Sequence, residues 1–389
     1  MLIFAAAMLA VFTGALIGAP VPGMTDVGAF FIDLLKMLVV PIAFTSIAGA
    51  ILQLGSGKKA RNLTGKAMGL MVAMSAAGVI LGLGLAEMAA ITLPGGIQPE
   101  KEIRAAVPTF WGFVRGCIPV NPVAALADGN MLQVIVLSII TGAATLCLPW
   151  KEREAVRCGF EIAQHLCAKI TAGVLRLAPI GVFCLLYPIA SKDWAGLASG
   201  YAAMAGLLIL GTIIYMTAIG LPVLLLNGIR QPWQLMQELI PGDVIGAISG
   251  GATNYLAPRI QRMKECTSTS PASIDYLLPL MAVLMRAGSC ICVGIYTVAA
   301  AEAFGVPVTI EQIAVVIPLT IIALTAAPGI IGGTLMDCAI IWAAVGIPLE
   351  SVALFAGVDY MMDVLRTVLN IHGGEVVTAA VGGEKEWKK

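Results

Sequence analysis

Charged side chains are scarce in this chain of 389 residues, where they make up 12% of the sequence. Soluble domains contain roughly 25%. Aromatic residues reach only 6%, and the two histidines, His165 and His372, are far apart in the sequence. The nine cysteines show neither zinc-site spacing nor a disulfide framework, so we expect small buried apolar side chains, no metal and no cofactor. The formal net charge is zero, which gives no reason to expect a nucleic-acid partner.

Apolar residues dominate the composition instead. They form 59% of the chain, and the mean hydropathy is +0.94. Runs of membrane-spanning length recur from end to end, which predicts an all-α polytopic membrane protein. The first run lacks the basic start of a signal peptide, so we expect it to be a span. The eight predicted transmembrane helices cover about 1–18, 27–53, 67–92, 108–148, a stretch from after the basic loop 151–157 to about 190, 199–227, 274–303 and 349–381.

Two further segments are interrupted by glycine and proline. Residues 233–266 are broken around Gly246 and Pro258, and residues 311–346 around Ala327-Pro328-Gly329 and Gly332. Such breaks free backbone groups that lipid cannot satisfy, so they persist only where they face protein or a water-filled cavity. Paired interrupted segments point to the binding site of a transporter. We therefore expect two re-entrant helical hairpins.

The distribution of basic residues supports this topology. With both interrupted segments as hairpins, the basic loops 58–66 and 151–157 and the C-terminal lysines share one side. The other side keeps only Lys101, Arg104 and Lys192. Because basic residues collect in cytoplasmic loops, we expect a multi-pass protein of the plasma (inner) membrane with both termini cytoplasmic.

Four polar residues of the last predicted helix share one face. Asp359, Asp363, Arg366 and Asn370 follow the spacing i, i+4, i+7 and i+11, which places them on one side of a helix. Charged groups at membrane depth are costly and usually face a protein interior or a cavity. Two readings remain open: an internal ion pair that locks two helices, or a polar ligand site.

Several motifs resemble the glutamate transporter homologue family, the dicarboxylate/amino acid:cation symporters. The resemblance rests on KMLVVPIAF, NPVAALADGNMLQVIVL, LAPIGVF and DYMMDVLRTVLN, which occur in order along almost the whole chain. It implies a homotrimer of elevator-type transporters in contact with membrane lipid. The scaffold would comprise residues 1–66 (spans 1–2) and 108–197 (spans 4–5, trimerisation). The transport domain would comprise 67–107 (span 3) and 198–389 (span 6, hairpin 1, span 7, hairpin 2 and span 8).

The resemblance also implies a set of substrate-binding residues. Asp363 would accept the substrate's ammonium group, Arg366 would bind its side-chain carboxylate as a bidentate fork, and Asn370 would bind its main-chain carboxylate. A carboxylate that binds an amine and an arginine that binds a carboxylate are together complementary to a zwitterion with an acidic side chain. The remaining substrate-binding positions are Ser289, Thr367 and, at the hairpin tips, Thr253, Asn254, Gly329 and Gly332.

The sequence departs from the family where sodium is bound. The family motif Asn-Met-Asp-Gly-Thr is replaced by Met285-Arg286-Ala287-Gly288-Ser289, so two oxygen-bearing side chains are lost. A later sodium-ligand Asp aligns with Gly374, next to Glu375, and a span-three Thr with Met74. At least two sodium sites are therefore expected to be dismantled, with no metal site in their place.

Arg286 introduces a fixed cation near the expected site. We expect its guanidinium to take the place of a sodium ion, paired with Asp363, Asp359 or Glu375; the competing reading is an arginine that reaches the aqueous face. A tethered charge is not released with substrate, so transport would be sodium-independent, either uncoupled or driven by protons. Asp337, within the second hairpin, is an additional intramembrane carboxylate. The favoured reading is a solvated hairpin residue, and the alternative is a proton site.

The sequence therefore predicts a secondary active or facilitative transporter of aspartate or glutamate. Two alternatives keep the same fold: a proton-coupled symporter of C4-dicarboxylates, or one of neutral amino acids. A substrate sensor that does not cycle is disfavoured by the glycine-broken hairpins. We expect no enzyme and no catalytic residue, because the chain lacks a protease motif and a His-Glu metal cluster.

Overall fold

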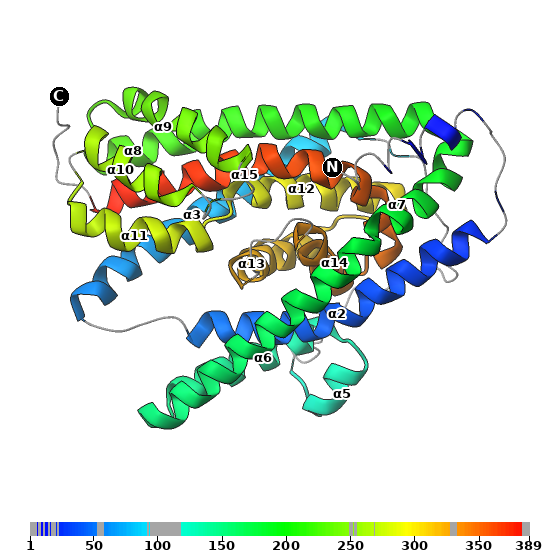
Figure 1. The fold of residues 1–389 in the computed structure, drawn as a ribbon, viewed down its shortest axis with the longest axis horizontal. Helices are drawn as coiled ribbons and strands as arrows, with labels where there is room; N and C mark the ends of the chain where they lie inside the picture. Colours follow the sequence, from blue (N-terminus) through cyan, green and yellow to red (C-terminus); the bar gives the residue numbers. More distant parts are fainter. Residues whose placement is uncertain are drawn as a thin grey trace. The chain divides into compact units, whose positions relative to one another are not determined.

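Helices account for nearly all of the chain that the computed structural model describes (Figure 1). The described residues are 23–52, 58–91, 118–248, 255–267, 269–326 and 333–382, with isolated positions at 6, 9–10, 12–14, 16, 21, 93 and 252. Within these ranges there is no β-strand. The all-α prediction is therefore confirmed for this part of the chain.

Three helical stretches in the described ranges are long and apolar enough to cross a membrane. They are Asn62–Ala89, Ala190–Leu226 and Pro271–Ala303, and they fall in the third, sixth and seventh predicted spans. Shorter apolar helices lie in the second, fourth and fifth spans and in the second hairpin. These helices agree with a multi-pass membrane protein, and the topology of eight spans and two hairpins stays a prediction.

The chain divides into two compact units. Unit 1 comprises Met1–Leu54, Ile91–Ala202 and Tyr296–Tyr360. Its described elements are α2 (Met24–Leu52), α5 (Pro122–Ala127), α6 (Met131–Leu146), most of α7 (Trp150–Ile214), the C-terminal part of α12 (Ala287–Ala303), α13 (Ile310–Ala326), α14 (Gly333–Val345), a 3₁₀ turn (Leu349–Ser351) and the start of α15 (Val352–Gly382).

Unit 2 comprises Gly55–Ala90, Ala203–Ile295 and Met361–Lys389. It contains most of α15 and the N-terminal part of α12, which carry the predicted substrate-binding residues Ser289, Asp363, Arg366, Thr367 and Asn370. Its remaining elements are α3 (Lys58–Ala89), the end of α7, a π-helix (Tyr215–Gly220), α8 (Leu221–Leu226), α9 (Pro232–Ile248), α10 (Leu256–Cys266) and α11 (Pro271–Leu284).

Both interrupted segments are pairs of helices that pack on each other. α9 packs against α10 in unit 2, and α13 packs against α14 in unit 1. Gly246 and Pro258, around which the first break was predicted, lie within α9 and α10, because proline is tolerated in the first turn of a helix and a single glycine costs only about 1 kcal/mol. The tip residues Thr253, Asn254, Gly329 and Gly332 lie outside the described residues.

Local sequence explains the break between α5 and α6. Asn121 Oδ1 accepts hydrogen bonds from the backbone of Val123 (3.0 Å) and Ala124 (3.2 Å), and Pro122 begins the helix, as the N-cap preference predicts. Gly129 then takes a φ of +66°, and Asn130 caps α6. The NPVAALADGNM motif thus encodes a stop and a restart of the helix.

Two expectations for local structure were wrong. The basic stretches 58–66 and 151–157 were expected to be loops, but α3 begins at Lys58 and α7 at Trp150, because Lys, Ala, Arg and Glu are good helix formers. Cysteines were expected to be buried, but Cys147 and Cys158 are exposed, at the end of α6 and on α7. Five of the described cysteines are buried: Cys184, Cys266, Cys290, Cys292 and Cys338.

Glycine allows α3 to contact the backbone of α12 within unit 2. A Cβ atom at Gly82 would lie 2.2 Å from the carbonyl oxygen of Ile291, and one at Gly294 would lie 2.7 Å from the backbone nitrogen of Leu83. Such close helix approach depends on small residues in membrane proteins. This contact fixes the position of α12 along the axis of α3.

We expect Gly82→Ala to destabilise the protein. The new methyl group meets backbone rather than a flexible side chain, and overpacking of this kind costs about 1–3 kcal/mol. The apparent Tm of the detergent-purified protein should fall by several degrees. Gly84→Ala is the matched control on the same helix, since its Cβ would meet nothing within 4 Å. Equal Tm values for the two variants would contradict the packing argument.

Candidate functional site

A two-residue break separates α11 from α12 inside an apolar stretch. The last turn of α11 closes with a hydrogen bond from Met285 N to Met281 O (2.8 Å), and α12 opens with one from Cys290 N to Arg286 O (2.8 Å). Met285 itself is extended, with φ −77° and ψ 122°. The side chain of Arg286 is half-buried. The break places the substituted motif beside α15.

The first turn of α12 contacts α15 directly. A Cβ atom at Gly288 would lie 2.1 Å from the carbonyl oxygen of Arg366. One residue further, Ser289 N donates to Asn370 Oδ1 (3.1 Å), and Asn370 Nδ2 donates to Ser289 Oγ (3.1 Å). Two predicted substrate-binding residues thus form a reciprocal pair across the two helices.

Arg366 and Asp363 form an ion pair one turn from that contact. The distance from Arg366 Nη2 to Asp363 Oδ1 is 2.8 Å. The side chain of Arg366 is 1% exposed and that of Asp363 is 25% exposed, so the carboxylate is the more accessible partner. A buried guanidinium needs an opposite charge, because leaving it uncompensated costs several kcal/mol. The pair therefore holds both charges on one face of α15.

Apolar side chains occupy the positions where the family resemblance places sodium ligands. Met285 and Ala287 are 1% and 0% exposed. Both lie against Gly373 of α15, where an added Cβ atom would meet Met285 Cε at 3.0 Å and Ala287 Cβ at 3.3 Å. Neither side chain has an oxygen atom. At Gly373 these two side chains therefore face α15 with carbon atoms.

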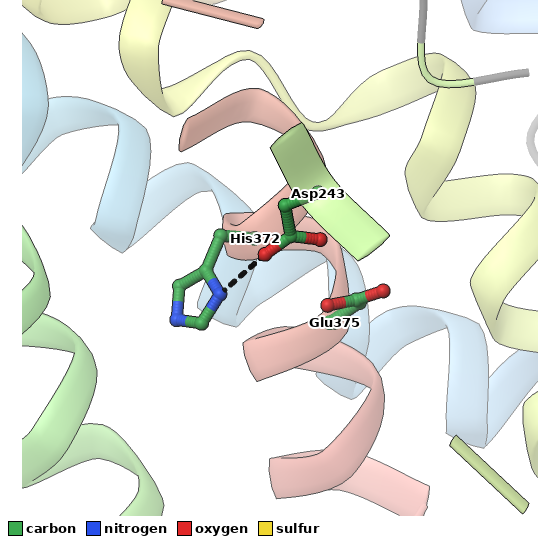
Figure 2. Close-up of side chains that lie close together, drawn as sticks. All are labelled: Asp243, His372 and Glu375. Carbon is green, nitrogen blue, oxygen red and sulfur yellow. Dashed lines mark hydrogen bonds and ion pairs between the residues drawn. The ribbon is translucent and has the colours of Figure 1, made fainter. Parts of the chain in front are cut away.

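A second charged group lies further along α15. Arg259 of α10 donates from Nε to Glu375 Oε1 (2.8 Å) and lies 3.9 Å from Asp243 Oδ1 of α9. His372 Nδ1 is 2.9 Å from Asp243 Oδ2. Figure 2 shows Asp243, His372 and Glu375, with the imidazole directed toward Asp243 and with Glu375 below Asp243. All four side chains are at most 2% exposed.

This group contains the ligand types of a metal site. Asp243, His372 and Glu375 each offer one ligand atom, all within 4.8 Å of one another. Arg259 Nε is already bonded to Glu375 and within ion-pair distance of Asp243. A divalent cation would have to share both carboxylates with a guanidinium, so the group does not fit a metal ion.

The other predicted residues lie in different surroundings. Asp359 belongs to unit 1 and accepts a long hydrogen bond from Tyr296 Oη (3.5 Å), beside an aromatic contact of Tyr296 with Phe355. Thr367 is half-buried on α15, and Asp337 is buried in α14. Pairing of Arg286 with Asp363, Asp359 or Glu375 stays a prediction. Glu375 has Arg259 as a partner, which the sequence analysis did not anticipate.

The sequence analysis missed Asp243 and Arg259 as site residues. One signal was available for the partners on α15: His372 and Glu375 are three residues apart, a spacing that puts both on one helical face. A second signal was a carboxylate in a largely apolar hairpin helix. Neither reveals that both helices of the hairpin meet α15 at this level, because such contacts depend on the tertiary fold.

Comparison of the chain with known proteins identifies its family. The model of the sodium:dicarboxylate symporter family matches residues 1–383. A proton/glutamate-aspartate symporter of Escherichia coli (strain K12) is 24% identical over 92% of this chain and 84% of the relative. A C4-dicarboxylate transport protein of Bacillus subtilis (strain 168) is 26% identical over 96% and 91%. A proton/glutamate-aspartate symporter of the same organism is 27% identical over 98% and 94%. The chain therefore belongs to the sodium:dicarboxylate symporter family, whose members are membrane transporters.

Proposed function

We propose that this protein transports acidic amino acids, aspartate or glutamate, by an elevator mechanism that does not require sodium. The observation that carries the proposal is the ion pair between Arg366 and Asp363, next to the Asn370–Ser289 pair. A cation, an anion and an amide are thus presented on consecutive turns of one helix. Two relatives at 24% and 27% identity are named proton/glutamate-aspartate symporters, which supports the substrate class.

An acidic amino acid complements this pair without leaving a charge uncompensated. Its side-chain carboxylate would replace Asp363 at the Arg366 guanidinium, and its ammonium group would bind the carboxylate that this exchange releases. Asn370 would donate its amide to the main-chain carboxylate after parting from Ser289. Each new contact is a charge-assisted hydrogen bond, which is stronger than a neutral one. Substrate binding would therefore exchange one ion pair for two.

The second candidate is a C4-dicarboxylate. A relative with this printed name is 26% identical over 96% of the chain. The structural observation in its favour is that Asp363 already has a cationic partner in Arg366. A dicarboxylate has no amine, so the negative charge of Asp363 would lie near the negative charge of the substrate. The repulsion between them disfavours binding. A neutral amino acid would leave Arg366 without a carboxylate partner from the substrate.

Sodium independence is supported by what surrounds the break in unit 2. Sodium sites of such transporters use unwound backbone and side-chain oxygens. Met285 and Ala287 provide no side-chain oxygen and are packed against Gly373. Arg286, in the same break, carries a permanent positive charge. We propose that this charge takes the electrostatic role of a bound cation.

Assembly and orientation complete the proposal. The family resemblance supports a homotrimer whose scaffold is formed by residues 1–66 and 108–197, with the rest of the chain moving as a transport domain. The basic residues of 58–66 and 151–157 and the C-terminal lysines support insertion in the inner membrane with both termini in the cytoplasm. The packed helix pairs, α9–α10 in unit 2 and α13–α14 in unit 1, support the two predicted hairpins.

We expect Asp363→Asn to weaken aspartate binding by about ten- to a hundredfold, since one charge-assisted hydrogen bond contributes about 1.5–3 kcal/mol. Binding to the purified protein is measured by calorimetry, with succinate as competitor. Asp275→Asn is the control, because this carboxylate is 53% exposed and pairs with Lys264. If wild-type protein prefers succinate, or if Asp363→Asn binds aspartate normally, the acidic amino acid assignment is wrong.

Replacement of sodium by choline should change the aspartate affinity of the wild-type protein by less than about threefold, well below one factor of ten or 1.4 kcal/mol. Arg286→Met restores the apolar, uncharged character of the family position and should weaken binding or make it depend on sodium. Both are measured on the purified full chain. A loss of aspartate affinity by orders of magnitude when choline replaces sodium would contradict the tethered-cation idea. Wild-type behaviour of Arg286→Met would contradict it as well.

A further inference from the structure

The buried group of Asp243, Arg259, His372 and Glu375 carries an excess of negative charge when both acids are ionised. Two carboxylates face one guanidinium, and each of the four side chains is at most 2% exposed. Burial of an uncompensated charge costs several kcal/mol. One additional proton makes the group neutral, with the imidazole uncharged. The charge count thus favours one bound proton.

The hydrogen bonds of the group lead to the same conclusion. Within the described part of the chain, Asp243 Oδ1, Glu375 Oε2 and His372 Nε2 are buried without a hydrogen-bond partner. Buried carboxylate oxygens are normally bonded to donors. A proton on one carboxyl group converts an acceptor into a donor, which can satisfy the neighbouring carboxylate. The two unpartnered oxygens therefore mark a place for a proton.

A cavity of about 400 Å³ connects this group with exposed side chains of the same hairpin. Its lining includes Arg259 and Glu375 at the buried end. It also includes the ion pair of Arg262 and Glu238, whose side chains are 48% and 44% exposed. The cavity thus extends from the exposed Arg262–Glu238 pair to the wall that contains Glu375. A proton can thus enter and leave without opening the contact between α12 and α15.

Arg259 links the group to the substrate-binding helix. Its Nη2 donates to the carbonyl oxygen of Ile371 (3.3 Å), and its Nη1 donates to that of Ala252 (3.1 Å) between α9 and α10. Ile371 follows Asn370, which bonds Ser289. A change in the charge of the group can therefore act, through the guanidinium of Arg259, on the backbone of the hairpin and on the turn that bears Asn370.

We propose that Asp243 and Glu375, with Arg259 and His372, form the site that carries a proton together with the substrate. The proton comes from water on one side of the membrane, forms an O–H bond at a carboxyl group and returns to water on the other side. Arg259 stays charged throughout and holds the hairpin to α15. The inference rests on the proposed transport function and identifies its coupling ion and the residues that bind it.

Other titratable groups face this site and must be considered in any pH dependence. Besides the four members, these are Glu238 of α9, Tyr255 before α10, and Arg262, Glu265 and Cys266 of α10. Glu238 and Arg262 neutralise each other at the exposed end of the cavity. Asp243 and Glu375 share the single guanidinium of Arg259. They are therefore the two acids whose negative charges are not fully balanced.

The test compares exchange with accumulation in proteoliposomes that contain the full-length protein. Exchange of external labelled aspartate for internal aspartate at equal pH needs no net proton movement. Accumulation driven by an acidic outside needs proton coupling, and a pH-sensitive dye in the lumen reports the proton flux. In Glu375→Gln and Asp243→Asn, the ratio of pH-driven accumulation to exchange should fall at least about tenfold, the factor that 1.4 kcal/mol represents. Asp275→Asn, at an exposed carboxylate, should keep the wild-type ratio.

Each outcome decides between the proposals. A wild-type ratio in both variants overturns the proton site, as does wild-type protein that moves aspartate without acidifying the lumen. If exchange and accumulation fall in equal proportion in both variants, the group only holds the hairpin in place, and the proposal is overturned. Absence of aspartate exchange in wild-type protein, with succinate exchange intact, contradicts the proposed substrate instead. Absence of both contradicts the transport function.

Discussion

The close contact between α12 and α15 is the constraint on which the predicted site depends. Gly288 brings the first turn of α12 onto the carbonyl of Arg366, and Ser289 and Asn370 exchange hydrogen bonds across the same contact. Any side chain larger than hydrogen at Gly288 would collide with backbone, which has no rotamer through which to move away. The helix break at 285–286 is therefore held at the level of the Arg366–Asp363 pair.

Two arginines from different elements organise the polar interior of unit 2. Arg366 belongs to α15 and pairs with a carboxylate one turn away. Arg259 comes from the hairpin and reaches across to Glu375. Buried ion pairs contribute little net stability, because desolvation offsets much of the Coulomb attraction, but loss of one partner is strongly destabilising. Both pairs are thus sensitive to a ligand or a proton that changes the charge or the position of one partner.

Their arrangement gives a physical account of how substrate and ion can affect each other. The proposed substrate would exchange the Arg366–Asp363 pair for two new contacts, next to Asn370. The proposed proton would change the charge of the group around Arg259, whose guanidinium bonds the carbonyl of the next residue, Ile371. Both events act on adjacent turns of one helix and on the hairpin. Transport needs such a shared element, because a ligand can shift a conformational equilibrium only through contacts that differ between the states.

The amino-acid sequence by itself determined the membrane class, the helical segments, the two interrupted regions and the polar face of α15. Those features depend on composition, helical periodicity and the local conformational limits of Gly and Pro. The family resemblance added the substituted motif around Arg286, whose sodium-replacing role stays a prediction. Only the tertiary structure decided that Arg259 and Asp243 meet Glu375 and His372, more than a hundred residues away. The physical reason is that side-chain periodicity specifies which face of a helix is polar, whereas packing of separate helices specifies which polar faces meet.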